Sequence, residues 1–193
     1  TFSQEVKDEL CEVKIKKDEA LAELAAMILF GENIVNNMIT LRTERAGIAA
    51  RIQLAFWKAI QEEVTIDIVK GRKNYCISVS TELAEKAGVY FSDDGEIALD
   101  EDIYESENSK RAFLRGAFLS CGTCSDPNKS YHIEFIAPYR TLSLDLLKIL
   151  TDFGLNAKHM LRRGINVIYI KDSTSIEELL TLMGAQMAAM EIM

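Results

Sequence analysis

A nine-residue pattern occurs twice in this chain. Residues 24–32 read LAAMILFGE, and residues 114–122, ninety positions later, read LRGAFLSCG. In each copy, small and apolar residues at helical spacing run into a turn that contains glycine. Because each copy begins a similar series of predicted elements, the chain is predicted to fold as two related units.

Each predicted unit has the same order of elements: a helix, a strand, a helix, a β-hairpin and a helix. The spacing of apolar residues and the Gly-containing turns set the boundaries. In the first unit the elements are predicted at residues 17–30, 33–43, 46–61, 64–69 with 75–80, and from about Thr81, the predicted N-cap, onward. In the second unit they are predicted at residues 109–121, 131–137, 142–153, 156–161 with 165–171, and from Ser173 onward.

This order predicts an α+β fold with pseudo-twofold symmetry, in which two antiparallel sheets surround a central pair of motif helices. The predicted domains are residues 1–91, with an N-terminal helix and the first repeat, an acidic linker at 92–108, and the second repeat at 109–193. Small residues four positions apart, Ala22 with Ala26 and Gly116 with Ser120, would let the motif helices approach closely. An Ala-rich core helix would have the same composition, but the duplicated placement favours helix pairing.

The two segments resemble the LAGLIDADG motif of homing endonucleases, which implies a LAGLIDADG homing-endonuclease-like fold. Where that family carries a metal-binding Asp or Glu, this chain has Gly31 and Cys121. Hydrolysis of a phosphodiester by this architecture needs a carboxylate at the base of each motif helix to hold Mg²⁺. Glycine offers no ligand, and a thiol disfavours Mg²⁺. Glu32 lies next to Gly31, but no acid follows Cys121 until Asp126. We therefore expect no enzymatic activity, no metal and no cofactor.

A longer resemblance covers nearly the whole chain. The string KRAFLRGAFLSCGTCSDPNKSYHIE at residues 110–134, FGLNAK at 153–158, MGA at 183–185 and the opening FSQEVKDEL resemble the WhiA family of bacterial sporulation and cell-division regulators. That resemblance implies a DNA-binding transcription factor in which a degenerate LAGLIDADG domain precedes a C-terminal helix-turn-helix domain. The helix-turn-helix part is expected to lie outside this sequence. The expected partners are DNA, bound mainly through that part, and a second regulator protein.

Composition limits these expectations. The net charge of −8 opposes strong DNA binding, because such binding depends on neutralising phosphates with basic side chains. No apolar run approaches a membrane-spanning length, so a cytoplasmic, nucleoid-associated protein is expected.

Cys121 and Cys124 form a CxxC pair, but Cys11, Cys76, His132 and His159 do not supply the remaining ligands of a zinc site at a suitable spacing. We interpret the pair as small buried residues.

Basic residues in the two predicted hairpins are the DNA-binding candidates. They are Lys70, Arg72 and Lys73 in the first hairpin and Lys158, Arg162 and Arg163 in the second. In homing endonucleases the sheets form a saddle over DNA, so the resemblance implies that these residues face the duplex. Charged hairpin turns also serve solubility alone, and the sequence does not separate the two interpretations.

Three functions follow as hypotheses. The first is a catalytically inactive, DNA-binding module of a transcription regulator. The second is a protein-interaction or ligand-sensing domain without direct DNA contact, which suits the acidic net charge. The third is a residual Mg²⁺-dependent endonuclease.

Overall fold

Alternating apolar and polar residues specify the strands of this chain, and the structure, a computed structural model, groups them into sheets. It describes residues 1–69, 71, 73–100 and 102–193, without the side chains of residues 32 and 33. The chain divides into two compact units, each described below by itself. We call Lys14–Ser120 the middle unit, and Thr1–Val13 together with Cys121–Met193 the terminal unit.

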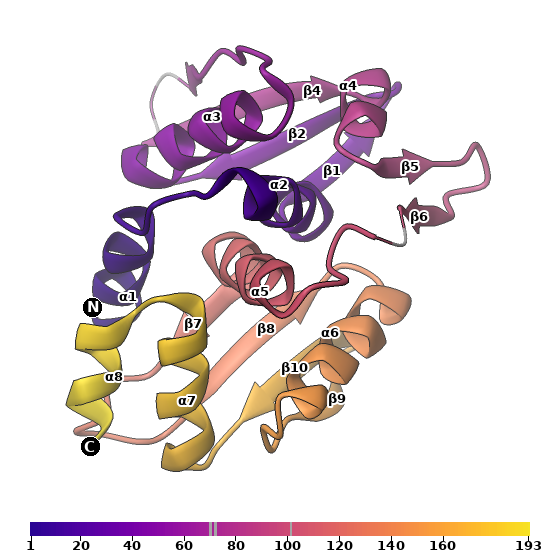
Figure 1. Cartoon of the computed structure of the whole chain (residues 1–193). Helices are drawn as coiled ribbons and strands as arrows, with labels where there is room; N and C mark the ends of the chain where they lie inside the picture. The colour runs from indigo at the N-terminus through magenta and orange to yellow at the C-terminus, as the bar shows by residue number, and fades with distance from the viewer. Residues whose placement is uncertain (70, 72, 101) are drawn as a thin grey trace. The chain divides into compact units, whose positions relative to one another are not determined.

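The middle unit contains a four-stranded antiparallel sheet in the order β1-β2-β4-β3. Helix α3 packs on one face of this sheet, against β2 and β4 (Figure 1). A short hairpin, β5–β6, follows α4. The elements are α2 (Lys17–Phe30), β1 (Glu32–Val35), β2 (Met38–Thr43), α3 (Ala46–Ile60), β3 (Asp67–Val69), β4 (Asn74–Ser80), α4 (Thr81–Lys86), β5 (Val89–Phe91), β6 (Ile97–Leu99) and α5 (Glu107–Cys121), whose last residue belongs to the terminal unit.

The terminal unit contains a second four-stranded antiparallel sheet, in the order β7-β8-β10-β9. Helix α6 packs on one face of it, and α1 lies against α8 (Figure 1). The elements are α1 (Phe2–Cys11), β7 (Gly122–Cys124), β8 (Ile133–Ala137), α6 (Arg140–Asp152), β9 (Lys158–Arg162), β10 (Ile165–Ile170), α7 (Ser173–Met183) and α8 (Gln186–Ile192). Among the described residues, no helix has the length and apolar character needed to cross a membrane.

The two sheets share one strand order, which confirms the predicted duplication. In each repeat a motif helix is followed by a first hairpin, a helix that covers the sheet, and a second hairpin. The strands of the two hairpins together form the four-stranded sheet. The predicted α+β architecture with two antiparallel sheets is therefore correct. The division of the sequence at residues 92–108 stays a prediction, because the compact units follow spatial contacts and both motif helices belong largely to the middle unit.

The two motif helices, α2 and α5, pack closely inside the middle unit. A Cβ added at Gly116 would clash with the carbonyl oxygen of Glu23 and would lie 3.0 Å from the Cβ of Ala26. The Ser120 hydroxyl lies 3.5 Å from the carbonyl oxygen of Met27, to which it donates. The predicted role of the small residues is confirmed at Ala26, Gly116 and Ser120, and Ala22 is fully buried.

Several boundaries differ from the prediction. The single strand expected at residues 33–43 is a hairpin, β1–β2, because Asn36 and Asn37 adopt positive φ angles of 52° and 61° and reverse the chain. The prediction that Thr81 caps the helix after β4 was wrong. Ser80 is the N-cap, since its hydroxyl accepts a hydrogen bond from the Leu83 backbone N–H at 3.1 Å. Four further elements, β5, β6, β7 and α8, were not predicted, and β6 lies within the predicted acidic linker.

Candidate nucleic-acid interface

The ends of the motif helices offer no carboxylate from the positions that carry the acid in LAGLIDADG enzymes. Gly31 follows the last residue of α2, and a Cβ there would lie 2.8 Å from the carbonyl oxygen of Met27. Cys121 is the last residue of α5, and desolvation raises the pKa of its thiol to about 12. Both Cys121 and Cys124 are free thiols. Within the described part of the chain, no group of three or more His, Cys, Asp or Glu residues could hold a metal ion.

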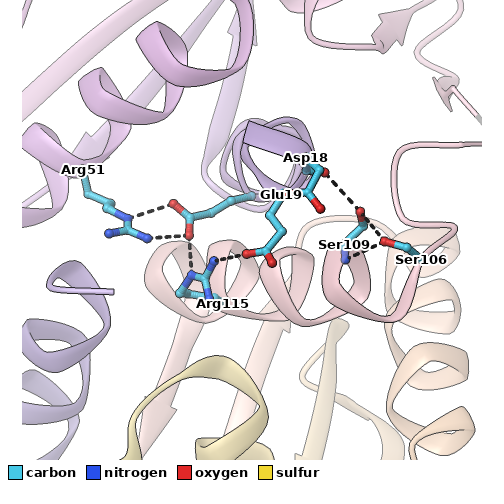
Figure 2. Close-up of polar contacts among 7 residues, drawn as sticks. Asp18, Glu19, Arg51, Ser106, Ser109 and Arg115 are labelled. Carbon is cyan, nitrogen blue, oxygen red and sulfur yellow. Dashed lines mark hydrogen bonds and ion pairs between the residues drawn. The ribbon is translucent and has the colours of Figure 1, made fainter. Parts of the chain in front are cut away.

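Of the two motif helices, α2 carries buried acidic residues before its C-terminal end, and arginines neutralise them (Figure 2). Glu23 is fully buried, and its carboxylate accepts two hydrogen bonds of 2.8 Å from the Arg51 guanidinium of α3. Arg115 of α5 also donates to the Glu23 carboxylate and lies 3.8 Å from that of Glu19. This buried ion-pair cluster ties α2, α3 and α5 together, and its carboxylates are already matched by fixed cations.

The predicted basic residues lie in the two hairpins as expected, where the structure describes them. Lys70 and Arg72 lie outside the described residues. Lys73 is exposed in the turn before β4. In the terminal unit, Lys158 and Arg162 are the first and last residues of β9, and both are exposed. Since they are four positions apart on one strand, they lie on the same face of the sheet.

That face of the terminal sheet bears a hydrogen-bonded cluster centred on Glu134 of β8. The Arg162 guanidinium donates to the two oxygens of the Glu134 carboxylate at 3.0 and 3.1 Å. The Nε2 atom of His132 lies 3.1 Å from Oε2 of Glu134. The hydrogen bond from Arg162 holds the pKa of the Glu134 carboxyl below its ordinary value, against the opposing effect of burial. Arg162 is thus held in one orientation by a carboxylate on the same face.

The same face continues onto β10. Tyr169 pairs with Glu134 on one side and with Lys158 on the other, so the three side chains project together. The Tyr169 ring stacks on that of His132 with a centroid separation of 6.1 Å, and Lys171 places its Nζ 5.3 Å from the Tyr169 centroid. We call this set, Glu134, Lys158, Arg162, Tyr169 and Lys171, the open face of the terminal sheet. It combines cations, a hydrogen-bond acceptor and an aromatic ring, which are the groups that contact nucleic acids.

Sequence reasoning missed Glu134, Tyr169 and Lys171 as members of this face. The signal was present as strict alternation, because His132 and Glu134 alternate with the fully buried Ile133 and Phe135. In the middle unit a similar alternation places the exposed Arg42 next to the buried Leu41 on β2. Basic residues within strands therefore belong among the candidates as much as those in turns.

The turn between β9 and β10 contains an arginine in a backbone conformation that is unfavourable for this residue type. Arg163 and Gly164 connect the paired residues Arg162 and Ile165, with φ angles of 51° and 78°. Positive φ at both central positions defines a type I′ turn, in which Asn and Gly are preferred. The β1–β2 turn of the other unit follows that preference with Asn36 and Asn37. A non-glycine residue without a short polar side chain costs about 1–2 kcal/mol in this conformation, so Arg163 occupies its position at a cost in stability.

The fold and the helix ends define a LAGLIDADG homing-endonuclease-like protein without the acidic residue of either motif. I-DmoI, crystallised in complex with DNA and manganese, has a TM-score of 0.59 with this chain at 15% identity, over 87% of this chain and 98% of I-DmoI. Residues 110–193 match the family model described as the WhiA LAGLIDADG-like domain. A probable cell division protein WhiA from Clostridium botulinum is 33% identical over 214 residues, covering all of this chain and 67% of the relative. The chain belongs to the WhiA family.

Other family members agree in sequence and in fold. A probable cell division protein WhiA from Clostridium perfringens is 31% identical over 211 residues, again across the whole chain. The crystal structure of full-length WhiA from Thermotoga maritima has a TM-score of 0.80 at 25% identity. This chain spans 64% of the length of that protein.

Proposed function

We propose that this chain is a catalytically inactive, DNA-contacting module of a bacterial transcription regulator that acts in cell division and sporulation. It would position the regulator on DNA through the open face of the terminal sheet and the β9–β10 turn. A helix-turn-helix domain beyond the second repeat would supply most of the affinity. The two repeats, residues 1–91 and 109–193 joined by the acidic segment 92–108, form the scaffold in this proposal.

The observation that carries the proposal is Arg163 at the tip of the β9–β10 turn. A turn selected for stability alone would favour Asn or Gly at a positive-φ position, as Asn36 and Asn37 illustrate in the other unit. Stability given up at one exposed position is typical of a residue retained for contact. A guanidinium at the end of a hairpin can reach a phosphate, and Arg162 and Lys158 lie on the adjoining strand.

The proposal that the module is inactive is supported by the helix ends. Gly31 has no side chain, and the carbonyl oxygen of Met27 leaves little room for one without a backbone shift. Cys121 holds a protonated thiol at neutral pH, because desolvation raises its pKa to about 12. Neither group binds Mg²⁺, which requires hard oxygen ligands.

A DNA titration tests the proposal. We expect the chain to bind a fluorescent duplex weakly at low salt, and Arg162→Ala with Arg163→Ala to weaken binding and lower the salt slope by up to about 2. Lys16→Ala with Lys17→Ala is the matched control, since it removes the same charge from exposed residues at the start of α2. An unchanged salt slope in the hairpin variant would remove this hairpin from the interface.

A cleavage assay tests inactivity separately. Supercoiled plasmid incubated with the chain and Mg²⁺ is expected to remain supercoiled. Nicking that disappears in Glu32→Gln would overturn this part of the proposal and favour a residual endonuclease.

A second candidate function is protein interaction without DNA contact. The net charge of −8 favours it, since the chain as a whole repels phosphates. No binding of the chain to duplex at low salt, together with binding by a longer chain that extends past Met193, would assign all DNA contact to the added part.

A further inference from the structure

A groove runs between α1 and α8 in the terminal unit. It has a volume of about 490 Å³. Phe2 and Ala188 supply buried apolar surface to it. Its other described lining residues are Glu5, Asp8, Glu9, Glu12, Met187 and Glu191. Five of these eight side chains are carboxylates and none is basic.

The two walls of the groove are fixed to each other by Glu9. Its carboxylate accepts a hydrogen bond of 2.8 Å from the backbone N–H of Met187 and one of 2.9 Å from that of Ala188. These bonds satisfy N–H groups in the first turn of α8, which have no partner within that helix. The groove is thus preformed, and binding in it would not require the two helices to come together first.

Methionines of α8 form an exposed apolar strip beside the carboxylates. Met187 is 73% exposed and Met190 is 67% exposed, and their spacing of three positions puts them on one face of the helix. Methionine side chains are flexible and polarisable, and they adapt to varied apolar partners. Glu5 of α1 and Glu12, the C-cap residue of that helix, are seven positions apart, about two helical turns, and both are exposed.

We propose that this acidic, methionine-edged groove binds an amphipathic helix of another protein whose apolar face is flanked by Lys and Arg. The apolar side chains of such a helix would cover Met187 and Met190, and its cations would pair with Glu5, Glu12 and Glu191. A nucleic acid is disfavoured here because carboxylates repel phosphates. A second copy of this chain is disfavoured as well, because a twofold contact through the groove would bring carboxylates against carboxylates. The proposal is independent of DNA contact by the open face.

Peptide binding tests the groove. The probe is a fluorescein-labelled 18-residue peptide with leucine on one helical face and lysine on the other, and a scrambled peptide of the same composition is its control. In about 0.15 M salt, where the Debye length is about 8 Å, we expect the amphipathic peptide to bind at least tenfold more tightly than the scrambled one. With ¹³C-methyl-labelled methionine, the signals of Met187 and Met190 should shift on binding, while those of Met38 and Met160 in the sheets should not.

Paired variants separate the groove from general acidity. Glu5→Gln with Glu12→Gln, and separately Met187→Ser with Met190→Ser, should each weaken peptide binding at least tenfold. Asp152→Asn with Glu178→Gln removes the same charge from exposed positions of the same unit and should leave binding unchanged. Equal loss in this control, or equal binding of the scrambled peptide, would overturn the proposal.

Two other occupants of the groove, a second copy of this chain and further residues of the same chain, would give different experimental results. If the chain self-associates in sedimentation and Met187→Ser with Met190→Ser dissociates it, the groove binds a second copy and the proposal is wrong. If a longer chain that continues past Met193 fails to bind the peptide while this chain binds it, residues of the chain itself fill the groove, which also overturns the proposal.

Discussion

Gly116 on α5 lies directly against the backbone carbonyl of Glu23 on α2. A side chain at this position would meet the carbonyl oxygen and then the Cβ of Ala26, so the contact between the motif helices requires glycine. Backbone atoms cannot move aside as the end of a flexible side chain can. The contact therefore sets how closely α2 and α5 approach.

Gly116→Ala is expected to destabilise the chain. Overpacking of a tight core contact costs about 1–3 kcal/mol, and the backbone partner at Glu23 places the loss at the upper end of that range. Gly47→Ala is the matched control, because nothing lies within 4 Å of a Cβ added to Gly47 in α3. Alanine in a helix is favoured over glycine by up to about 1 kcal/mol, so the control should be neutral or stabilising. Urea unfolding followed by circular dichroism measures both, and equal effects would contradict the close-contact interpretation.

Glu23→Gln is expected to cost about 3–5 kcal/mol, because it removes the carboxylate that neutralises the buried Arg51 and Arg115. Glu107→Gln breaks an exposed pair with Arg111 on α5 and should cost no more than about 0.5 kcal/mol. Denaturant unfolding of the two variants beside the parent chain gives the comparison. A loss below 1 kcal/mol for Glu23→Gln would mean that the cluster does not stabilise the middle unit.

Arg163→Asn is expected to raise stability while weakening DNA binding. Asparagine tolerates the left-handed conformation better than arginine does, so the free energy of unfolding should rise by about 0.5–1 kcal/mol. The loss of one cation should reduce affinity for duplex DNA at low salt and lower the salt slope by about 1. Thermal unfolding and the DNA titration, run on the same preparation, measure the two effects. A variant that gains stability and keeps full affinity would mean that Arg163 is not retained for DNA contact.

The stabilising effect of Glu134 should depend on pH in a defined direction. Its pKa is lowered in the folded state, chiefly by the hydrogen bond from Arg162, so its contribution to stability is complete above the unfolded pKa of about 4.3. The contribution is lost as the pH falls through the lower, folded pKa. The difference in unfolding free energy between the parent chain and Glu134→Gln should therefore shrink in acid. A constant difference for Glu134→Gln from pH 7 to pH 3 would contradict the assignment.

Cys121 and Cys124 are expected to resist alkylation in the folded chain. Desolvation raises the pKa of each thiol to about 12, and the thiolate is the reactive form. Iodoacetamide labelling at pH 8, followed by peptide mass spectrometry, should modify both residues only after urea is added. Rapid labelling of either in the native chain, or a disulfide between them, would revive a redox role for the CxxC pair.

Local patterns in the sequence were enough to predict the duplicated fold. Helices α2, α3, α5, α6 and α7 follow apolar periodicity, and Gly31 ends α2 as expected. The hairpin at Asn36 and Asn37 was missed because β-branched residues surround it and indicate one continuous strand. Strand β7 was missed because it has only three residues, Gly122–Cys124, and acquires strand geometry by pairing with β8.

The charge network could not be predicted, because it depends on contacts between distant residues. Glu23 joins Arg51, 28 positions away, and Arg115, 92 positions away, and in sequence each looks like a solvent-exposed helix residue. The basic residues were predicted from their place in the two hairpins and from the resemblance to homing endonucleases. Lys73, Lys158, Arg162 and Arg163 are exposed, as that interpretation expects. Their contact with DNA stays a prediction.

The packing of α5 inside the middle unit has a consequence for synthesis of the chain. Helix α2 and its sheet are translated long before residues 107–120 emerge from the ribosome. The ion pair between Glu23 and Arg115 can therefore form only late in synthesis. Contacts between residues so far apart in sequence close late and slow folding. A nascent chain that stops within residues 92–108 would present the uncovered side of α2 to chaperones. Adding the missing helix as a separate fragment should rescue it by complementation.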